Sequence, residues 1–135
     1  MVSKPAADIR LASPEAGEEE LAEIAAVLET GHLTMGPKVE EFETLLAAAA
    51  GTQHAAAVSS GTAALHVAVL ALGIGDGDEV LVPAYTFPAT ANVVALAGAR
   101  PVLVDVDPVT MNMDPADAAR RVTRRTKAIT TSGAA

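Results

Sequence analysis

The chain has 135 residues, and half of them are hydrophobic although only 2% are aromatic, so one domain with a core of small side chains is expected. Its net charge of -8 argues against nucleic acid as the main partner, because binding to phosphates requires clustered Lys and Arg. The absence of cysteine excludes disulfides and thiolate metal sites and is compatible with a cytoplasmic location.

No part of the sequence is typical of a signal peptide or a membrane span. Residues 1–10 are polar and no apolar run follows them. Residues 55–72 are rich in Ala, Val and Leu, but polar residues such as Ser59 and His66 interrupt them. We therefore expect a cytoplasmic protein that binds neither membrane nor nucleic acid.

The first part of the chain predicts two helices separated by a loop. Pro14 follows Ser13 at a helix start, apolar residues then recur at helical spacing, and Gly31 ends the pattern. Pro37 begins a second helical pattern, which Gly51 stops. We expect the glutamates of both helices to lie mostly on solvated faces.

A predicted first strand, residues 55–58, leads through a tight turn into a third helix over residues 60–72. The turn consists of Ser59, Ser60, Gly61 and Thr62. Its hydroxyl groups and backbone N–H groups lie where the helix dipole is positive, which suits a phosphate, but an ordinary N-cap explains the same residues. The helix is apolar nearly all round, which predicts burial on both sides, between a sheet and other helices.

Strands alternate with helices in the rest of the chain. Strands are predicted over 79–83, 101–107 and 126–130, and helices over 89–97 and 115–123. This alternation implies βαβ units and a largely parallel sheet, in which ligands bind at the carboxyl ends of the strands. Two segments fall at such ends: the Ser60-Gly61-Thr62 turn and the Tyr85-Thr86-Phe87 loop.

An ordered set of short motifs runs from about Ser13 to Ile129. The set contains Gly31-His32-Leu33-Thr34-Met35-Gly36-Pro37, Ser59-Ser60-Gly61-Thr62-Ala63-Ala64-Leu65, Gly75-Asp76-Gly77-Asp78-Glu79-Val80, Pro83-Ala84-Tyr85-Thr86-Phe87, Asp105-Val106-Asp107 and Thr126-Lys127-Ala128-Ile129. In this order and at these spacings it resembles the DegT/DnrJ family of pyridoxal-phosphate (PLP)-dependent sugar aminotransferases.

The resemblance implies an α/β fold. Residues 1–135 would form the N-terminal portion of the aspartate-aminotransferase-like (PLP fold type I) large domain, with a mostly parallel, incomplete sheet that ends before the catalytic lysine. In the family's sheet, strands formed later in the chain separate the first strand from the next three. We therefore expect the strands near 80, 103 and 128 to pair, and the strand near 56 to lack its neighbour. Exposed apolar surface and open edges predict marginal stability or aggregation.

The resemblance also implies an activity and a site. Family members typically move an amino group from glutamate to a keto-sugar attached to a nucleotide, and they are usually homodimers. By that likeness Gly61 and Thr62 bind the phosphate of PLP, and Phe87 stacks on the pyridine ring, although a core phenylalanine is the alternative. Thr34 and Gly36 match a loop near the substrate sugar.

The family's Schiff-base lysine has no counterpart in this sequence, so we expect no activity from the chain alone and weak binding of PLP or none. In family members that lysine lies well downstream of the Thr-Lys-Ala-Ile strand, as do a carboxylate for the pyridine nitrogen and a serine. Lys4 lies in the lead-in, Lys38 at a helix start and Lys127 at the entry to a strand. The small, polar tail 130–135 departs from the family pattern. A truncated gene, a frame-shifted gene or an assembly error would each produce such a tail.

No metal site is expected. The three histidines, His32, His54 and His66, do not have ligand-like spacing and are expected to have polar or packing roles. Asp105 and Asp107 are expected to have structural roles at the end of a strand.

Two other interpretations stay open. One is a small stand-alone α/β module that binds a phosphate or nucleotide, although the sequence has neither Gly-x-Gly-x-x-Gly nor a Walker-type motif. The other is a non-functional gene remnant. A lysine-containing continuation of the DNA after codon 135 favours an aminotransferase piece or a remnant, and a clean stop favours the module.

Overall fold

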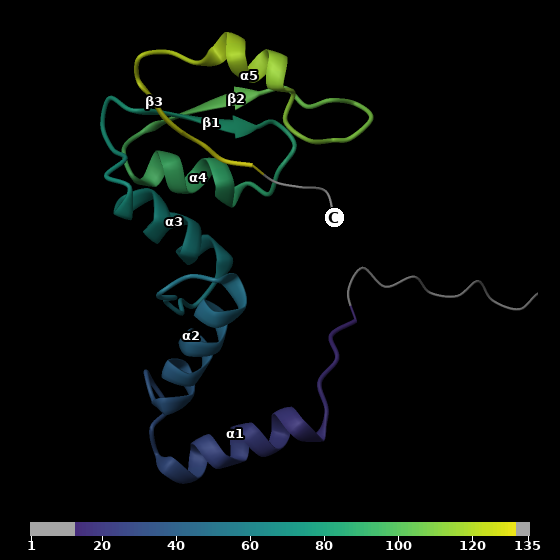
Figure 1. The fold of residues 1–135 in the computed structure, drawn as a ribbon, viewed down its shortest axis with the longest axis vertical. Coiled ribbons are helices and arrows are strands. Elements are labelled where there is room, and N and C mark those ends of the chain that lie inside the picture. Colours follow the sequence, from purple (N-terminus) through teal and green to yellow (C-terminus); the bar gives the residue numbers. More distant parts are fainter. Residues whose placement is uncertain (1–12, 132–135) are drawn as a thin grey trace, which may run out of the picture. The chain divides into compact units, whose positions relative to one another are not determined.

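The computed structural model describes residues 13–131, which form two compact units, one ending at Ala56 and the other beginning at Ala57 (Figure 1). The first unit contains two helices, α1 (Glu18–Thr30) and α2 (Pro37–Ala50). An ion pair joins them, because Lys38 Nζ lies 2.7 Å from Glu23 Oε2.

The helix boundaries of the first unit agree with the prediction except at the start of α1. That helix begins later than the Ser13-Pro14 signal suggests, because Gly17 is its N-cap and the Gly17 N–H donates to Glu20 Oε2 at 2.6 Å. The predicted start of α2 at Pro37 is confirmed, and both helices end at the predicted glycines, Gly31 and Gly51.

The second unit is a parallel sheet with helices on both faces. Its elements are α3 (Gly61–Ala71), β1 (Glu79–Pro83), α4 (Ala89–Leu96), β2 (Arg100–Val104), α5 (Pro115–Arg121) and β3 (Thr126–Ile129). The strand order is β2-β1-β3, and Leu81 aligns with Val102 and Ile129. The predicted pairing of these three strands is therefore confirmed.

The core lies on both sides of β1, which is buried along its whole length. Successive side chains of a strand point to opposite faces. Val80 and Val82 pack in one cluster with Val93 and Val94 of α4, whereas Leu81 packs in a second cluster. The second cluster contains Val104 and Ala118. Figure 1 shows α4 and α5 on opposite faces of the sheet.

Glu79 begins β1 at the amino-terminal edge of the sheet. Its side chain is only 3% exposed, and Oε1 lies 2.7 Å from Arg125 Nη2 and 3.6 Å from Arg100 Nη1. The Thr123 hydroxyl donates to Oε2 at 2.6 Å. This hydrogen bond, followed by the two guanidinium charges, lowers the pKa of Glu79. The carboxylate thus connects the start of β1 to the first residue of β2 and to the segment just before β3.

Three predictions about the chain from residue 55 onward require correction. Residues 55–58 belong to no strand in the described part of the chain, since the three-stranded sheet does not include them. The strand predicted over 101–107 ends at Val104, because the Asp105 N–H donates to Asp117 of α5. Val106 instead forms a separate antiparallel bridge with Met113.

The third correction concerns α3, which is not buried on both sides. Val69 is its buried residue, while Val67 and Leu70 are 51% and 54% exposed. The apolar surface that remains is the feature expected of a helix over an incomplete sheet. Within residues 13–131 no helix has the length and apolar character needed to cross a bilayer.

Candidate functional site

The first turn of α3 places Ser60, Gly61 and Thr62 at a helix N-terminus. Ser60 is the N-cap: its Oγ accepts the Ala63 N–H at 3.1 Å, and its carbonyl accepts the Ala64 N–H at 3.0 Å. The N–H groups of Gly61 and Thr62, at the start of the helix, have no intrahelical carbonyl to bond. These donors, the helix dipole and the exposed Thr62 side chain make the turn suitable for an anion.

Among the described residues, neither the backbone conformation nor a close neighbour requires glycine at position 61. Its φ is not positive, and a Cβ built on it would meet no atom within 4 Å. Glycine within a helix is less favourable than alanine by about 0.5–1 kcal/mol. A ligand that approaches the backbone closely at this position would account for the missing side chain.

The loop between β1 and α4 carries Phe87 at the carboxyl end of the sheet. Phe87 is 75% exposed, so the alternative of a core phenylalanine is wrong for the described residues. An exposed ring at this end of a parallel sheet lies where ligands of such sheets bind, and it can stack on a flat aromatic ligand.

The turn of α3 and the Phe87 loop belong to the same end of the second unit. A short turn connects the end of α3 to the start of β1, and α3 packs mainly on α4, with Val69 in the same buried cluster as Val93 and Val94. The end of α3 therefore lies toward the amino-terminal end of β1, and its first turn lies away from that end. In Figure 1 the arrow of β1 points toward the loop that leads into α4, away from the end of α3.

Thr34 and Gly36 lie in the first unit, in the loop between α1 and α2. They line a pocket of about 220 Å³ together with apolar side chains that include Val27 and Val39. A Cβ on Gly36 would lie 3.2 Å from His32 Cβ and 3.3 Å from His32 O, so close packing is enough to explain this glycine. A contact of Thr34 and Gly36 with a sugar stays a prediction.

Of the two lysines in the described part of the chain, Lys38 is held in ion pairs that oppose a role as a nucleophile. Lys38 Nζ binds Glu23 at 2.7 Å and Glu41 at 3.0 Å, and these hydrogen bonds raise the pKa of Lys38. A higher pKa keeps the ammonium group protonated, and a protonated amine cannot attack a carbonyl carbon. Lys127 is an exposed residue of β3, and Lys4 lies outside the described residues.

Asp105 and Asp107 stabilise the chain where it leaves β2, as predicted. Asp105 Oδ1 accepts the Val106 N–H at 2.9 Å. Asp107 Oδ1 accepts the N–H groups of Thr110 and Val109 at 2.7 and 3.0 Å, and these bonds lower the pKa of Asp107. In residues 13–131 no group of three His, Asp or Glu side chains is arranged to hold a metal ion.

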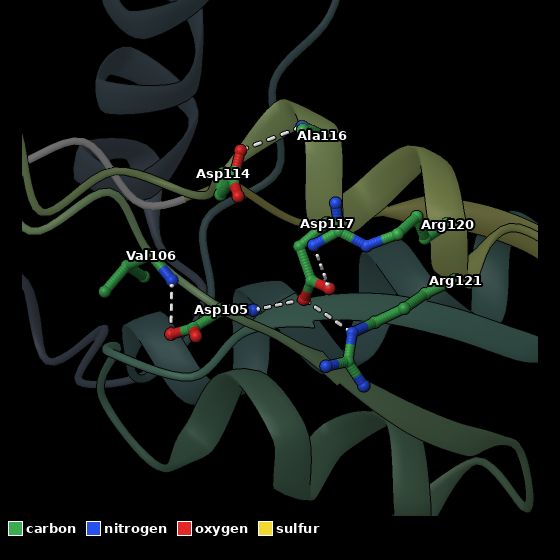
Figure 2. A network of polar contacts seen from close by, with 7 residues as sticks. All are labelled: Asp105, Val106, Asp114, Ala116, Asp117, Arg120 and Arg121. Carbon is green, nitrogen blue, oxygen red and sulfur yellow. Dashed lines mark hydrogen bonds and ion pairs between the residues drawn. The ribbon is translucent and has the colours of Figure 1, made fainter.

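Sequence reasoning missed Asp117, a buried carboxylate of α5 (Figure 2). Its Oδ2 accepts the Asp105 N–H at 2.8 Å and contacts Arg121 Nε at 2.5 Å, while Oδ1 contacts Arg120 at 3.0 Å. The bond from Asp105, followed by that from Arg121, lowers the pKa of Asp117 to about 2. The spacing of the arginines, three and four residues later, was the available signal.

This architecture matches part of the fold of type I PLP aminotransferases. Spr1654 from Streptococcus pneumoniae, described as a candidate sugar aminotransferase, aligns with 91% of the chain at 36% identity and a TM-score of 0.88. The PLP form of Spr1654 gives a TM-score of 0.86 at 37% identity. S. venezuelae DesV aligns with 82% of the chain at 42% identity and a TM-score of 0.79. A synthase of 3-amino-5-hydroxybenzoic acid aligns with 89% at 41% identity and a TM-score of 0.83.

The model of the DegT/DnrJ/EryC1/StrS aminotransferase family matches residues 14–133. The chain therefore belongs to this family of PLP-dependent aminotransferases, and the resemblance inferred from the motifs is confirmed. It spans about a third of the length of the solved relatives: 31% of Spr1654, 30% of DesV and 32% of the synthase.

Proposed function

We propose that this chain supplies the phosphate-binding turn and the ring-stacking residue of a PLP-dependent aminotransferase. Its substrate would be a nucleotide-linked keto-sugar and its amino donor glutamate. Gly61 and Thr62 would hold the cofactor phosphate, Phe87 would cover one face of the pyridine ring, and Thr34 and Gly36 would contact the sugar. When bound, PLP supplies the electron-accepting ring that amino transfer requires.

The observation that carries the proposal is the unexplained glycine at the start of α3. Ser60 already satisfies the Ala63 N–H, so the turn is stable as a helix cap without help from Gly61. A phosphate fits the open space beside Gly61, where first-turn N–H groups and the helix dipole favour an anion. The Thr62 hydroxyl can donate one further hydrogen bond to a phosphate oxygen.

Phe87 would position the pyridine ring and exclude water from one of its faces. Its exposed ring can stack on a pyridine and shield that face from solvent. Amino transfer also needs an amine nucleophile, and neither Lys38 nor Lys127 is suited to that role. The chain alone is therefore proposed to bind the cofactor weakly and without catalysing the reaction, and homodimer formation is likewise proposed only for the complete enzyme.

Equilibrium binding of PLP and of inorganic phosphate to the full chain tests the proposal. Gly61→Ala should weaken both ligands by about tenfold, the equivalent of about 1.4 kcal/mol, because the new methyl group occupies the space beside the backbone. Phe87→Ala should weaken PLP by a similar factor and leave phosphate unchanged. Tyr85→Ala is the matched control, since Tyr85 is an exposed aromatic residue of the same loop.

Three results would contradict the proposal. One is PLP binding that does not saturate, and another is saturable binding that neither Gly61→Ala nor Phe87→Ala changes. The third is a single lysine that borohydride reduction labels stoichiometrically with PLP, since that would identify a nucleophilic amine in the chain. If a nucleoside diphosphate binds as tightly as PLP, and independently of Phe87, the result favours a stand-alone nucleotide-binding module.

A further inference from the structure

We infer that Thr90 is the positioning residue for Phe87. Its hydroxyl, bonded to that of Thr86, holds the loop between β1 and α4 in the conformation that presents the aromatic ring. The two Oγ1 atoms lie 3.1 Å apart, and Thr90 is only 8% exposed. The role of the ring as a cofactor contact rests on the proposed function, whereas the anchoring of the loop does not.

Packing alone does not fix the loop. Ala84, Tyr85, Phe87 and Pro88 are all exposed, so the segment buries little apolar surface. Backbone hydrogen bonds hold its two ends: the Ala84 N–H donates to Val104 O at 2.7 Å, and the Thr90 N–H donates to Phe87 O at 3.0 Å. Between these ends, the hydroxyl of Thr86 attaches the loop to the buried face of α4.

The hydroxyl of Thr90 needs an explanation, because it lies on the core side of its helix. Val93 and Val94, three and four residues later, share that side and are almost completely buried. A polar group in such a place is unfavourable unless it forms a hydrogen bond, and valine has the same shape without the hydroxyl. Pro88, the N-cap of α4, provides no side-chain cap, so Thr86 supplies the side-chain contact at the start of this helix.

Amide hydrogen exchange followed by mass spectrometry tests the anchoring in the full chain. In Thr90→Val the amides of residues 84–90 should exchange roughly two- to tenfold faster than in the wild type, because one hydrogen bond no longer opposes local opening. The amides of β1 should be unchanged, since valine preserves the packing. Thr90→Ser keeps the hydroxyl and should restore the protection of the loop.

A second measurement connects the anchor to the ring. Thr90→Val should weaken PLP by the same roughly two- to tenfold factor and leave inorganic phosphate unchanged, because the first turn of α3 is not altered. Thr90→Ser should bind PLP like the wild type. If Thr90→Val damaged the structure in general, PLP and inorganic phosphate would both bind more weakly. Thr90→Ser would then show the same loss of affinity as Thr90→Val.

Each remaining outcome decides the inference. Unchanged exchange in Thr90→Val overturns the anchoring. Faster exchange with unchanged PLP affinity overturns the positioning of Phe87. If the wild-type chain binds no PLP, the proposed function fails for this chain, but the exchange data still establish or reject the anchor.

Discussion

Asp117 accepts the backbone N–H of Asp105 at 2.8 Å, and this bond joins the first turn of α5 to the first residue after β2. The same carboxylate binds Arg120 and Arg121 of its own helix. One buried charge therefore ends the hydrogen-bond ladder of β2 and attaches α5 to one face of the sheet. It also offsets the positive charges of Arg120 and Arg121 in the last turn of that helix.

The low pKa of Asp117 predicts a loss of stability in acid. An unfolded aspartate has a pKa of about 3.9, whereas that of Asp117 in the folded protein is about 2. Since the folded pKa is the lower one, the stabilisation is complete above about pH 4 and disappears as the pH falls through about 2. Urea unfolding of Asp117→Asn, followed by circular dichroism, should differ from the wild type above pH 4 and converge with it near pH 2.

Asp76→Asn serves as the control, because Asp76 is an exposed carboxylate in the turn before β1. At pH 6 its free energy of unfolding should differ from that of the wild type by less than about 0.5 kcal/mol, because surface substitutions of this kind have small effects. An Asp117→Asn defect of equal size at pH 6 and pH 2 would show that the carboxylate charge does not carry this stabilisation.

Val94 lies where α4 packs on the sheet and is fully buried. Val94→Ala removes two methyl groups from this contact and should lower the free energy of unfolding by about 2 kcal/mol. Leu96→Ala in the same helix should change it by less than about 0.5 kcal/mol, since Leu96 is 70% exposed. Equal urea midpoints for the two variants would mean that the core does not form at this face.

The turn that begins α3 predicts opposite effects for two neighbouring substitutions. Ser60→Ala removes the acceptor for the Ala63 N–H and should destabilise the protein by about 1 kcal/mol. Gly61→Ala meets no steric obstacle and should stabilise the protein by up to about 0.5 kcal/mol, although it should weaken phosphate binding. Thermal midpoints measured without ligand separate the two effects, and a destabilised Gly61→Ala protein would indicate a structural role for this glycine.

We expect the chain to self-associate through β3, the edge strand that carries Ile129. It is 51% exposed on β3, which is an edge strand of the described sheet. Sedimentation velocity should show association that grows with concentration, and Ile129→Lys should reduce it, because a charge on an edge opposes strand pairing. Val109→Lys adds the same charge at an exposed loop position and should have less effect. A monomeric wild type with a sharp, cooperative thermal transition would contradict this prediction.

Local signals in the sequence were sufficient for most helices and strands. Glycine at the ends of α1 and α2 and Pro37 at a helix start have short-range physical causes, and each is confirmed. The start of α1 was mispredicted because Ser13-Pro14 and Gly17 with Glu20 both satisfy the rules for a helix start. Only the second pair forms the capping hydrogen bond.

Features that depend on long-range contacts could not be predicted in this way. The apolar run before Ser59 has the composition of a strand, but strand formation requires a neighbouring chain segment. The exposure of α3 depends in the same way on what covers it. The residue pattern singled out the turn with Gly61 and Thr62 and the loop with Phe87, and the family resemblance supplied their roles toward PLP. The structure adds the reason why Gly61 is unusual. The contact between Thr86 and Thr90 has no sequence signature beyond its spacing.

The buried carboxylate at the start of β1 also has a consequence for synthesis of the chain. Glu79 forms its two shortest side-chain contacts with residues 44 and 46 positions later, Thr123 and Arg125. When β1 and β2 leave the ribosome, only Arg100 is present to balance that charge, and its contact is longer. The sheet is therefore completed late, when the segment before β3 arrives, and until then the side of β1 that pairs with β3 is open to incorrect partners.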